Sequence, residues 1–258
     1  MTSTRNQEAP LPMVPTVKGL TFRAYRGEAD IAAIAELMRA CNAANGVARN
    51  DSAISMRLRF EAMTRVDPFE DVILAFAGER LVAFSTITWD DTTDGQRHYR
   101  AQGWVHPEER RQGIGSAMWE RNERRIVQMA AGHGHVQTRV LTTILPERDL
   151  GGLALAAENG CHRVRLYHHM VRPDLDDIDV PALPSGMEIG PVSPDLLPAL
   201  WDAANDAFQG HFGADDTSEA AYRRWIKDPR LDLSLLCVAF AGTEIAGAVH
   251  GMIDACLL

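Results

Sequence analysis

One stretch decides the fold of this chain: Val105-His106-Pro107-Glu108-Glu109-Arg110-Arg111-Gln112-Gly113-Ile114-Gly115-Ser116-Ala117. The pattern is typical of the end of a strand, a tight basic turn and the first turn of a helix. Gly113 and Gly115 allow the backbone to approach a ligand closely, because neither carries a Cβ atom. The free N–H groups and the dipole at the start of a helix favour an anion, so we expect a phosphate or pyrophosphate here.

The composition is typical of a soluble globular protein, with 46% hydrophobic and 24% charged residues among 258. The formal charge of -9 argues against a broad surface for nucleic acid or for an anionic membrane, so the anion site must be local. No apolar run approaches the roughly 20 residues that a membrane-spanning helix needs. We therefore expect neither a nucleic-acid partner nor a membrane partner.

The chain has four cysteines that lie far apart and form no Cys-x-x-Cys pair: Cys41, Cys161, Cys237 and Cys256. This spacing gives neither a zinc ligand set nor a disulfide framework, so we expect no metal and a cytoplasmic location. Residues 1–19 are polar, contain three prolines and lack an apolar signal core. They are predicted to be a disordered lead-in and not a targeting peptide.

Residues 20–172 are predicted to form one complete α/β unit with a mixed sheet. Apolar or alternating runs predict strands at 20–25, 72–77, 81–89, 98–105 and 135–143, and a last strand or strand pair at 161–171. Apolar stripes at helical spacing predict helices at 31–45, 52–64, from the glycine turn to about 131, and 150–158.

A second, related unit is predicted at 187–258, after a linker at 173–186 that is rich in proline and acidic residues. Ala75-Phe76-Ala77-Gly78 recurs as Ala239-Phe240-Ala241-Gly242, an offset of 239 − 75 = 164 residues. Strands at 187–192 and 235–241 and helices at 196–208 and 218–227 match the opening order of the first unit. The chain ends before a counterpart of the glycine turn, so we expect an incomplete second unit and one anion site.

Other nucleotide-binding turns fit the glycine stretch less well. A dinucleotide-binding turn needs a third glycine where Met118 stands, and a P-loop needs a Gly-Lys-Ser or Gly-Lys-Thr ending, which the chain lacks. The alternative that remains is a helix start whose glycines only ease packing.

The chain resembles the GNAT N-acetyltransferase superfamily. The signature of that family is Gln or Arg, two residues, Gly, one residue, and Gly or Ala, present here as Arg110-Arg111-Gln112-Gly113-Ile114-Gly115. The later turn Glu158-Asn159-Gly160-Cys161 is similar to the family's helix-to-strand turn. The resemblance implies a GNAT acyl-CoA N-acyltransferase fold for the first unit and the front half of another for the second. Tandem acetyltransferases of the mycothiol-synthase type have this doubled layout.

The resemblance implies acetyl-CoA as the acyl donor. Its pyrophosphate would lie on backbone N–H groups of the turn, and its acyl arm would run beside the strand that ends at Val105. The N–H of Val105 would stabilise the oxyanion formed when an amine attacks, a contribution of about 3 kcal/mol. The residues implied in binding acetyl-CoA are Val105, Arg110, Arg111, Gln112, Gly113, Ile114, Gly115 and Ser116.

The acid and base of the transfer are less clearly marked. Many family members use a tyrosine as acid, and its position, four residues before Gly160, holds Ala156 here. Tyr167 on the predicted last strand is the alternative acid, although a packing role for it is the simpler interpretation. His98 is the candidate base. Tyr99, Asp90 and Asp91 are alternatives, and adjacent strand residues face opposite ways, so only one of each pair can face a substrate.

The function expected from the sequence is acetyl-CoA-dependent N-acetylation of a small-molecule amine by direct attack. The alternative, favoured by the alanine at position 156, is a non-catalytic acetyl-CoA-binding or regulatory unit of a truncated tandem acetyltransferase. A truncated product without stable function, with an unpaired strand edge, is the third possibility.

Overall fold

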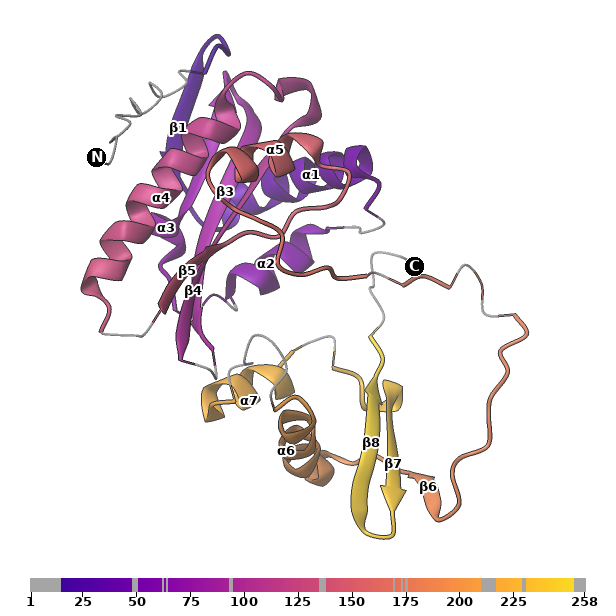
Figure 1. The fold of residues 1–258 in the computed structure, drawn as a ribbon. Coiled ribbons are helices and arrows are strands. Elements are labelled where there is room, and N and C mark those ends of the chain that lie inside the picture. The colour runs from indigo at the N-terminus through magenta and orange to yellow at the C-terminus, as the bar shows by residue number, and fades with distance from the viewer. Residues whose placement is uncertain are drawn as a thin grey trace, which may run out of the picture. The chain divides into compact units, whose positions relative to one another are not determined.

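The computed structural model describes residues 15–47, 51–61, 63, 65–92, 95–134, 138–168, 170–172, 174, 176–209, 217–228 and 231–252. It divides into two compact units, Met1–His162 and Arg163–Leu258. Figure 1 shows a five-stranded sheet flanked by helices in the first unit and a three-stranded sheet with helices in the second.

The first unit is built on a mixed sheet in the order β1-β2-β3-β4-β5. Its strands are β1 (Leu20–Ala24), β2 (Val72–Ala77), β3 (Arg80–Asp91), β4 (Gln96–Val105) and β5 (Thr138–Thr142). β1 to β4 are antiparallel to their neighbours, whereas β5 is parallel to β4. Parallel neighbours need a crossover connection, which α4 (Ile114–Gly132) provides. The glycine turn therefore lies where the chain leaves β4 and starts the crossover.

Helices cover both faces of this sheet (Figure 1). Besides α4 they are α1 (Glu28–Asn45), α2 (Ala53–Glu61), α3 (Pro68–Asp71) and α5 (Leu150–Glu158). α1 and α2 share a hydrophobic cluster with β2 and β3, and α4 packs in two clusters on the opposite face. A strand buried on both faces is apolar at successive positions, which explains the run Val72–Ala77.

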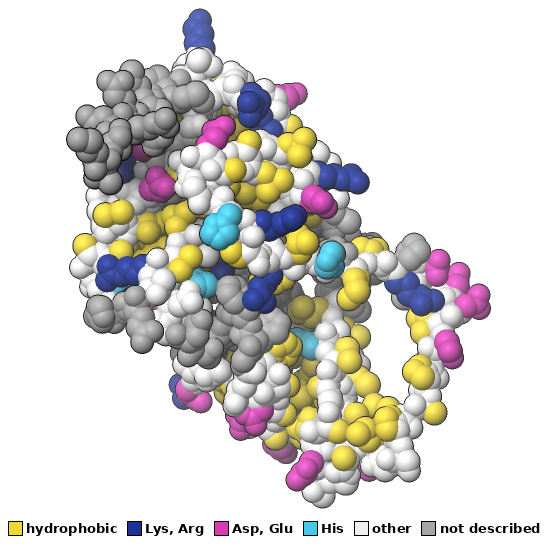
Figure 2. Space-filling view, in the orientation of Figure 1, with side chains coloured by type: hydrophobic (Ala, Val, Ile, Leu, Met, Phe, Trp, Pro, Cys, Tyr) yellow, Lys and Arg dark blue, Asp and Glu magenta, His cyan; other side chains and the backbone are white. Residues whose placement is uncertain are grey.

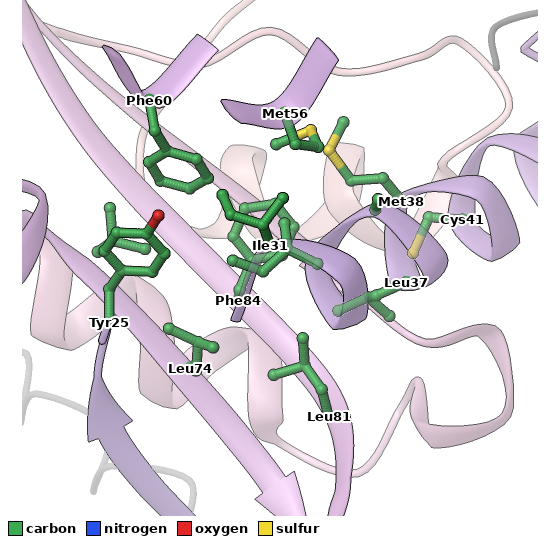
Figure 3. Close-up of a cluster of buried hydrophobic side chains, with 13 residues drawn as sticks. Tyr25, Ile31, Leu37, Met38, Cys41, Met56, Phe60, Leu74, Leu81 and Phe84 are labelled. Atoms are coloured by element: carbon green, nitrogen blue, oxygen red, sulfur yellow. The ribbon is translucent and has the colours of Figure 1, made fainter. Parts of the chain in front are cut away.

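The face of the sheet under α1 holds a large apolar cluster, shown in Figure 3. Ile31 and Met38 of α1 pack in one cluster with Phe84 of β3, whose side chain is only 1% exposed. Tyr25 and Phe60 belong to the same cluster, and their rings stack with centroids 4.6 Å apart. This packing holds α1 and α2 on one side of β3.

The opposite face of the sheet is covered by α4. Ile114, Met118 and Ile126 repeat at helical spacing and pack against β2, β3 and β4. Between these contacts, Ser85 of β3 donates a buried hydrogen bond to Asn122 Oδ1 of α4, at 3.2 Å. Because a buried hydroxyl and amide need such partners, this bond also sets the register of the helix on the sheet.

A hydrogen bond fixes the C-terminal end of α4. Tyr99 Oη lies 2.8 Å from His133 Nδ1, the two rings are nearly parallel, and the ring of Trp89 lies against His133 at 4.5 Å between centroids. Burial lowers the pKa of His133 from its usual 6.5, and Arg97 and Arg139 lower it further. The neutral imidazole can therefore accept the hydrogen of the tyrosine hydroxyl at neutral pH.

The second unit repeats the first three strands of the first. β6 (Met187–Gly190), β7 (Leu236–Ala241) and β8 (Glu244–His250) form an antiparallel sheet in that order. Its register is interrupted between Ala239 and Phe240, as the register of β2 with β3 is between Ala75 and Phe76. The repeat seen in the letters thus extends to the strand pairing and to a β-bulge at the equivalent place.

In the described part of the second unit, one face of this smaller sheet packs against helices. Leu197 and Leu200 of α6 (Leu197–Ala207) form a cluster with Leu236 and Val238 of β7, and α7 (Glu219–Ile226) contributes Trp225 to it. Hydrophobic side chains remain on the surface over these strands (Figure 2), among them Val249.

The prediction of a strand at 161–171 is wrong. Residues 161–168 and 170–172 are irregular, and Tyr167 is 63% exposed, while His169 lies outside the described residues. The alternation of apolar and basic residues there suits a strand. A strand forms, however, only where its backbone N–H and C=O groups pair with a neighbour, and the described residues of this run pair with no strand.

Two further local differences come from capping and from tertiary contacts. α3 was not predicted, although Asp67 accepts the N–H of Phe69 and Pro68 occupies the first helical position, which is a usual start signal. Residues 15–19, expected in the lead-in, belong to the first unit, since Thr16 donates its N–H to the carbonyl of Gln112 at 3.0 Å.

Within the described ranges, no helix is both long and apolar enough to cross a membrane. In the same ranges, no three His, Cys, Asp or Glu side chains converge as metal ligands would.

Replacing Phe84 by alanine should lower the free energy of unfolding by about 3–5 kcal/mol, because the large cavity cannot close in this packed cluster. The matched control is Phe22→Ala on β1, where the side chain is 43% exposed and the free energy of unfolding should fall by only about 1 kcal/mol. Urea titrations of both variants measure the difference. Equal losses would contradict the assignment of the core.

Stability should fall as the pH drops below about 6.5 in a way that depends on His133. The pKa of His133 is lower in the folded chain than in the unfolded chain, so the unfolded chain binds more protons as the pH falls. His133→Gln should flatten the curve of Tm against pH between about 7.5 and 5. The exposed His162, replaced in the same way, is the control and should leave the slope unchanged.

Candidate functional site

The sheet opens between β4 and β5. The two strands pair from Gln96 and Thr138 as far as Arg100 and Thr142, whereas β4 continues to pair with β3 up to Val105. Beyond Arg100, the last residues of β4 therefore have a strand neighbour on one side only. Gly103 is exposed although it lies inside the sheet, which agrees with a wedge-shaped opening at this edge.

The pairing pattern shows which backbone groups face this wedge. His106 donates its N–H to Val82 O at 2.8 Å, so this opposed pair is a hydrogen-bonded one. In an antiparallel ladder such pairs alternate with pairs whose N–H and C=O point away. Val105 and Gly103 are of the second kind, so their N–H groups point away from β3 and into the wedge.

The same alternation of hydrogen-bonded and non-hydrogen-bonded pairs continues toward the start of β4. Tyr99 belongs with Val105 and Gly103 in the alternation, and its carbonyl accepts a hydrogen bond from Thr142 Oγ1 of β5, at 3.5 Å. The carbonyl side of these residues therefore does face β5. After Thr142, β5 no longer pairs with β4, so the N–H groups on this side of β4 can bind a ligand in the wedge.

The basic turn is held in an unusual backbone conformation. After a short 3-10 helix at Pro107–Glu109, Arg111 has φ 63° and Gly113 has φ 82°. Positive φ is costly for a residue with a Cβ atom, so Arg111 is a strained position, whereas Gly113 meets the requirement without cost. Such strain clusters at ligand-binding turns.

The start of α4 offers uncapped backbone donors. Gly113 is the N-cap and supplies no side-chain hydrogen bond, and the first bond within the helix runs from Ala117 N–H to the carbonyl of Gly113, at 3.0 Å. The N–H groups of Ile114, Gly115 and Ser116 therefore have no partner within the helix. This arrangement and the helix dipole suit an anion.

The side chain of Arg110 fixes the turn through two hydrogen bonds to other parts of the first unit. Its Nε donates to the carbonyl of Val105 at 3.2 Å, and its Nη1 donates to Asn45 Oδ1 at the end of α1, at 3.0 Å. The guanidinium thus ties the end of β4 to the C-terminal end of α1, where a cation is also favoured by the helix dipole. The signature arginine is a positioning residue, and its side chain is directed into the protein.

Cys41 of α1 is the second donor to the carbonyl of Val105, through its thiol at 3.3 Å. Burial raises the pKa of this thiol to about 11 although Arg110 lies close by. Cys41 is therefore protonated at neutral pH and acts as a hydrogen-bond donor, not as a nucleophile. Burial also raises the pKa of Cys161, which argues against a nucleophilic role for that thiol.

The acidic side chains of the turn are neutralised locally. Arg80 pairs with Glu108 and with Glu109, and Gln112 Nε2 donates to Glu109 at 3.1 Å. Arg111, by contrast, has an exposed side chain. The turn therefore presents backbone donors and an exposed cation, with its carboxylates held in ion pairs.

The candidate acid and base residues lie in three different environments. His98 is buried on β4, at 7% exposure, beside Gln96, whose Oε1 lies 3.3 Å from its Nε2. Ala156 is buried in α5 just before a turn closed by Gly160 at φ 79°. Tyr167 lies in the irregular segment of the second unit, so the structure gives no support for it as an acid of this wedge.

Sequence reasoning missed one residue of the site, Gly103. It shares the backbone orientation of Val105 and lies one step further into the wedge. Its position two residues before Val105 was the available signal, because strand residues of like orientation recur at every second place.

Comparisons with known proteins agree with this geometry. Residues 32–143 match the family model described as acetyltransferase (GNAT) family. Mycothiol acetyltransferase of Catenulispora acidiphila is 27% identical over 228 residues, which are 85% of this chain and 69% of that protein. A crystal structure of a GCN5-related N-acetyltransferase from Sphaerobacter thermophilus has the same fold, with a TM-score of 0.67 and 21% identity over 92% of this chain and 73% of that chain.

The family match spans the wedge, the basic turn and the whole of α4, which are the parts of the chain that carry the site. Residues 32–143 of the first unit therefore carry a domain that matches the GNAT acetyltransferase family.

Proposed function

We propose that this protein transfers an acetyl group from acetyl-CoA to the amine of a small molecule by direct attack. The observation that carries the proposal is the opening of the sheet after Arg100 and Thr142, with the N–H groups of Gly103 and Val105 directed into it. A thioester arm in this opening can pair with β4 as a strand would, while its anionic end reaches the start of α4.

The residues of the turn fit such a donor. The uncapped N–H groups of Ile114, Gly115 and Ser116 suit a pyrophosphate, and the exposed Arg111 adds a positive charge. When bound, acetyl-CoA supplies an activated acyl group as a thioester.

Two backbone donors are positioned where negative charge develops. The N–H groups of Val105 and Gly103 are fixed by the β3–β4 ladder, so little reorganisation is needed when an amine attacks. Preorganised donors of this kind typically contribute about 3 kcal/mol each to the stabilisation of the transition state. Arg110 and Cys41 hold the carbonyl of Val105 and so fix the peptide unit that follows the Val105 N–H.

His98 remains the proposed acceptor of the proton that the amine loses. It lies on the face of β4 opposite α4. Because it is buried and stands well before Val105 along an extended strand, we propose that a chain of water molecules relays the proton. With Ala156 in α5, no side-chain acid stands at the family's tyrosine position, so the departing sulfur would be protonated by solvent in the wedge.

The alternative is a unit that binds acetyl-CoA without turnover, and Ala156 is the observation that favours it. A panel of small amines in an assay of CoA release distinguishes the two. Turnover above background supports the transfer, whereas background rates with retained binding support the alternative.

Ser116→Asp should weaken acetyl-CoA binding by about tenfold or more, because the new carboxylate repels a pyrophosphate at the start of α4. The same carboxylate should leave helix stability unchanged or raise it by about 0.3–1 kcal/mol, since the dipole favours it there. Calorimetric titration and thermal unfolding measure the two effects. Ser116→Asn, of equal size and neutral, should retain binding; if the aspartate variant also did, the anion site would be misplaced.

Replacing the Val105 amide with an ester, by incorporating the corresponding hydroxy acid, should lower kcat by about 10²–10³ with little change in Tm. The matched control is the ester at Trp104, whose N–H belongs to a hydrogen-bonded pair with β3. That ester should lower Tm and leave kcat nearly unchanged. The reverse pattern would show that the Val105 N–H stabilises the sheet and not the reaction.

A further inference from the structure

A polar stretch lies on the face of β3 and β4 opposite α4. It begins below the pair Phe84 and Trp104, whose stacked rings, 4.5 Å between centroids, pack with the α1 cluster. Side chains at every second position share this face. The next pairs along it are Thr86 with Gln102, Thr88 with Arg100, and Asp90 with His98.

This stretch contrasts with the other face of the same strands. There, Ile87, Tyr99 and Ala101 form an apolar cluster with α4. On the polar face Thr86 and His98 are both buried, at 3% and 7% exposure. Burying polar side chains costs free energy that apolar packing would not, so this polar centre between two apolar clusters is a candidate for a binding site.

The polar stretch lies next to the wedge. Arg100 stands opposite Thr142, in the last pair that β4 makes with β5, and Gln102 is one step beyond, beside Gly103. α4 fills the opposite face with Met118 and Ile126. An amine that approaches the wedge on the face opposite α4 would therefore meet the polar stretch.

Two guanidinium groups and one carboxylate, those of Arg59, Arg100 and Asp90, carry charge on this face. Arg59 of α2 donates from Nη2 to Gln102 Oε1 at 3.1 Å and lies over the ring of Trp104 at 5.3 Å. Arg100 Nη1 is 3.9 Å from Asp90 Oδ2, a loose ion pair. The local excess of positive charge stands out in a chain whose formal charge is -9.

We infer that the polar stretch is the acceptor site and that the acceptor is an amine that also carries a carboxylate. The inference rests on the proposed acetyl transfer. Arg100 binds the carboxylate, because a guanidinium offers paired N–H donors in the geometry of a carboxylate. The neighbouring cations also lower the pKa of the acceptor amine, which favours the uncharged form that attacks. An amino acid or a small amino-acid conjugate has the required groups.

The first experiment compares matched acceptors. Amino acids and their carboxamides are assayed in pairs for CoA release, each rate corrected for the fraction of uncharged amine. The native chain should prefer the carboxylate by at least about tenfold in kcat/KM. Arg100→Gln should reduce this ratio to within about twofold of one, mainly through KM. Arg124→Gln on the outer surface of α4, where the side chain is 69% exposed, is the control and should keep the native ratio.

A second measurement does not depend on turnover. N-acetylated amino acids and their carboxamides are titrated into the chain in the presence of CoA, and binding is followed by calorimetry. The native chain should bind the carboxylate form at least about tenfold more tightly, and Arg100→Gln should remove the difference.

The two measurements separate the failure of this inference from the failure of the proposed function. Absent turnover with the carboxylate preference kept in binding would refute acetyl transfer and leave the site assignment standing. Turnover without any carboxylate preference, or a preference that survives in Arg100→Gln, would overturn the inference.

Discussion

Two strands of a sheet share hydrogen bonds only while they remain about 4.8 Å apart. β4 and β5 keep this spacing as far as Arg100 and Thr142 and then separate. The N–H groups of Gly103 and Val105 are thereby left at an open edge inside the sheet, where a ligand can take the place of a strand. The functions proposed for the turn and for the polar face both depend on this separation.

The turn that follows β4 has to satisfy two demands at once. It must reverse the chain onto the far face of the sheet, where Ile114 and Met118 are buried, and it must leave the first N–H groups of α4 without caps. Gly113 allows the chain reversal through its positive φ. Because glycine has no side chain to cap the helix, the first N–H groups of α4 stay free of a side-chain cap. Arg110 offsets the loss of a cap by fixing the turn to Val105 and Asn45.

The second unit shows how much of the architecture belongs to the repeat. Its β7–β8 hairpin has the same bulge as β2–β3, at Ala239 and Phe240 in place of Ala75 and Phe76. In the first unit β3 is followed by β4, which carries the site. Within the described residues of the second unit, β8 pairs with β7 alone, and Val249 remains on its surface at 67% exposure. The hairpin is thus shared by both units, and the candidate site lies on the strand that follows it in the first unit.

The local pattern predicted most elements of the first unit, because helical spacing and apolar runs reflect burial directly. It failed at 161–171, where the alternation is that of a strand but the described residues pair with no neighbouring strand. It also missed α3, whose capping by Asp67 and Pro68 was visible in the letters. The turn itself was predicted correctly as an uncapped helix start, since Gly113 and Gly115 encode that geometry locally.

The sequence by itself determined the glycine turn, the amphipathic α4 and the internal repeat, because each depends on residues close together in the chain. Tertiary structure alone decided that the Arg110 side chain points inward to Asn45, that Gly103 joins Val105 at the wedge, and that Arg59 and Arg100 share a face. Those facts follow from strand register and helix packing, which bring together residues far apart in sequence. A function that depends on where β4 and β5 separate is therefore decided by the pairing of strands.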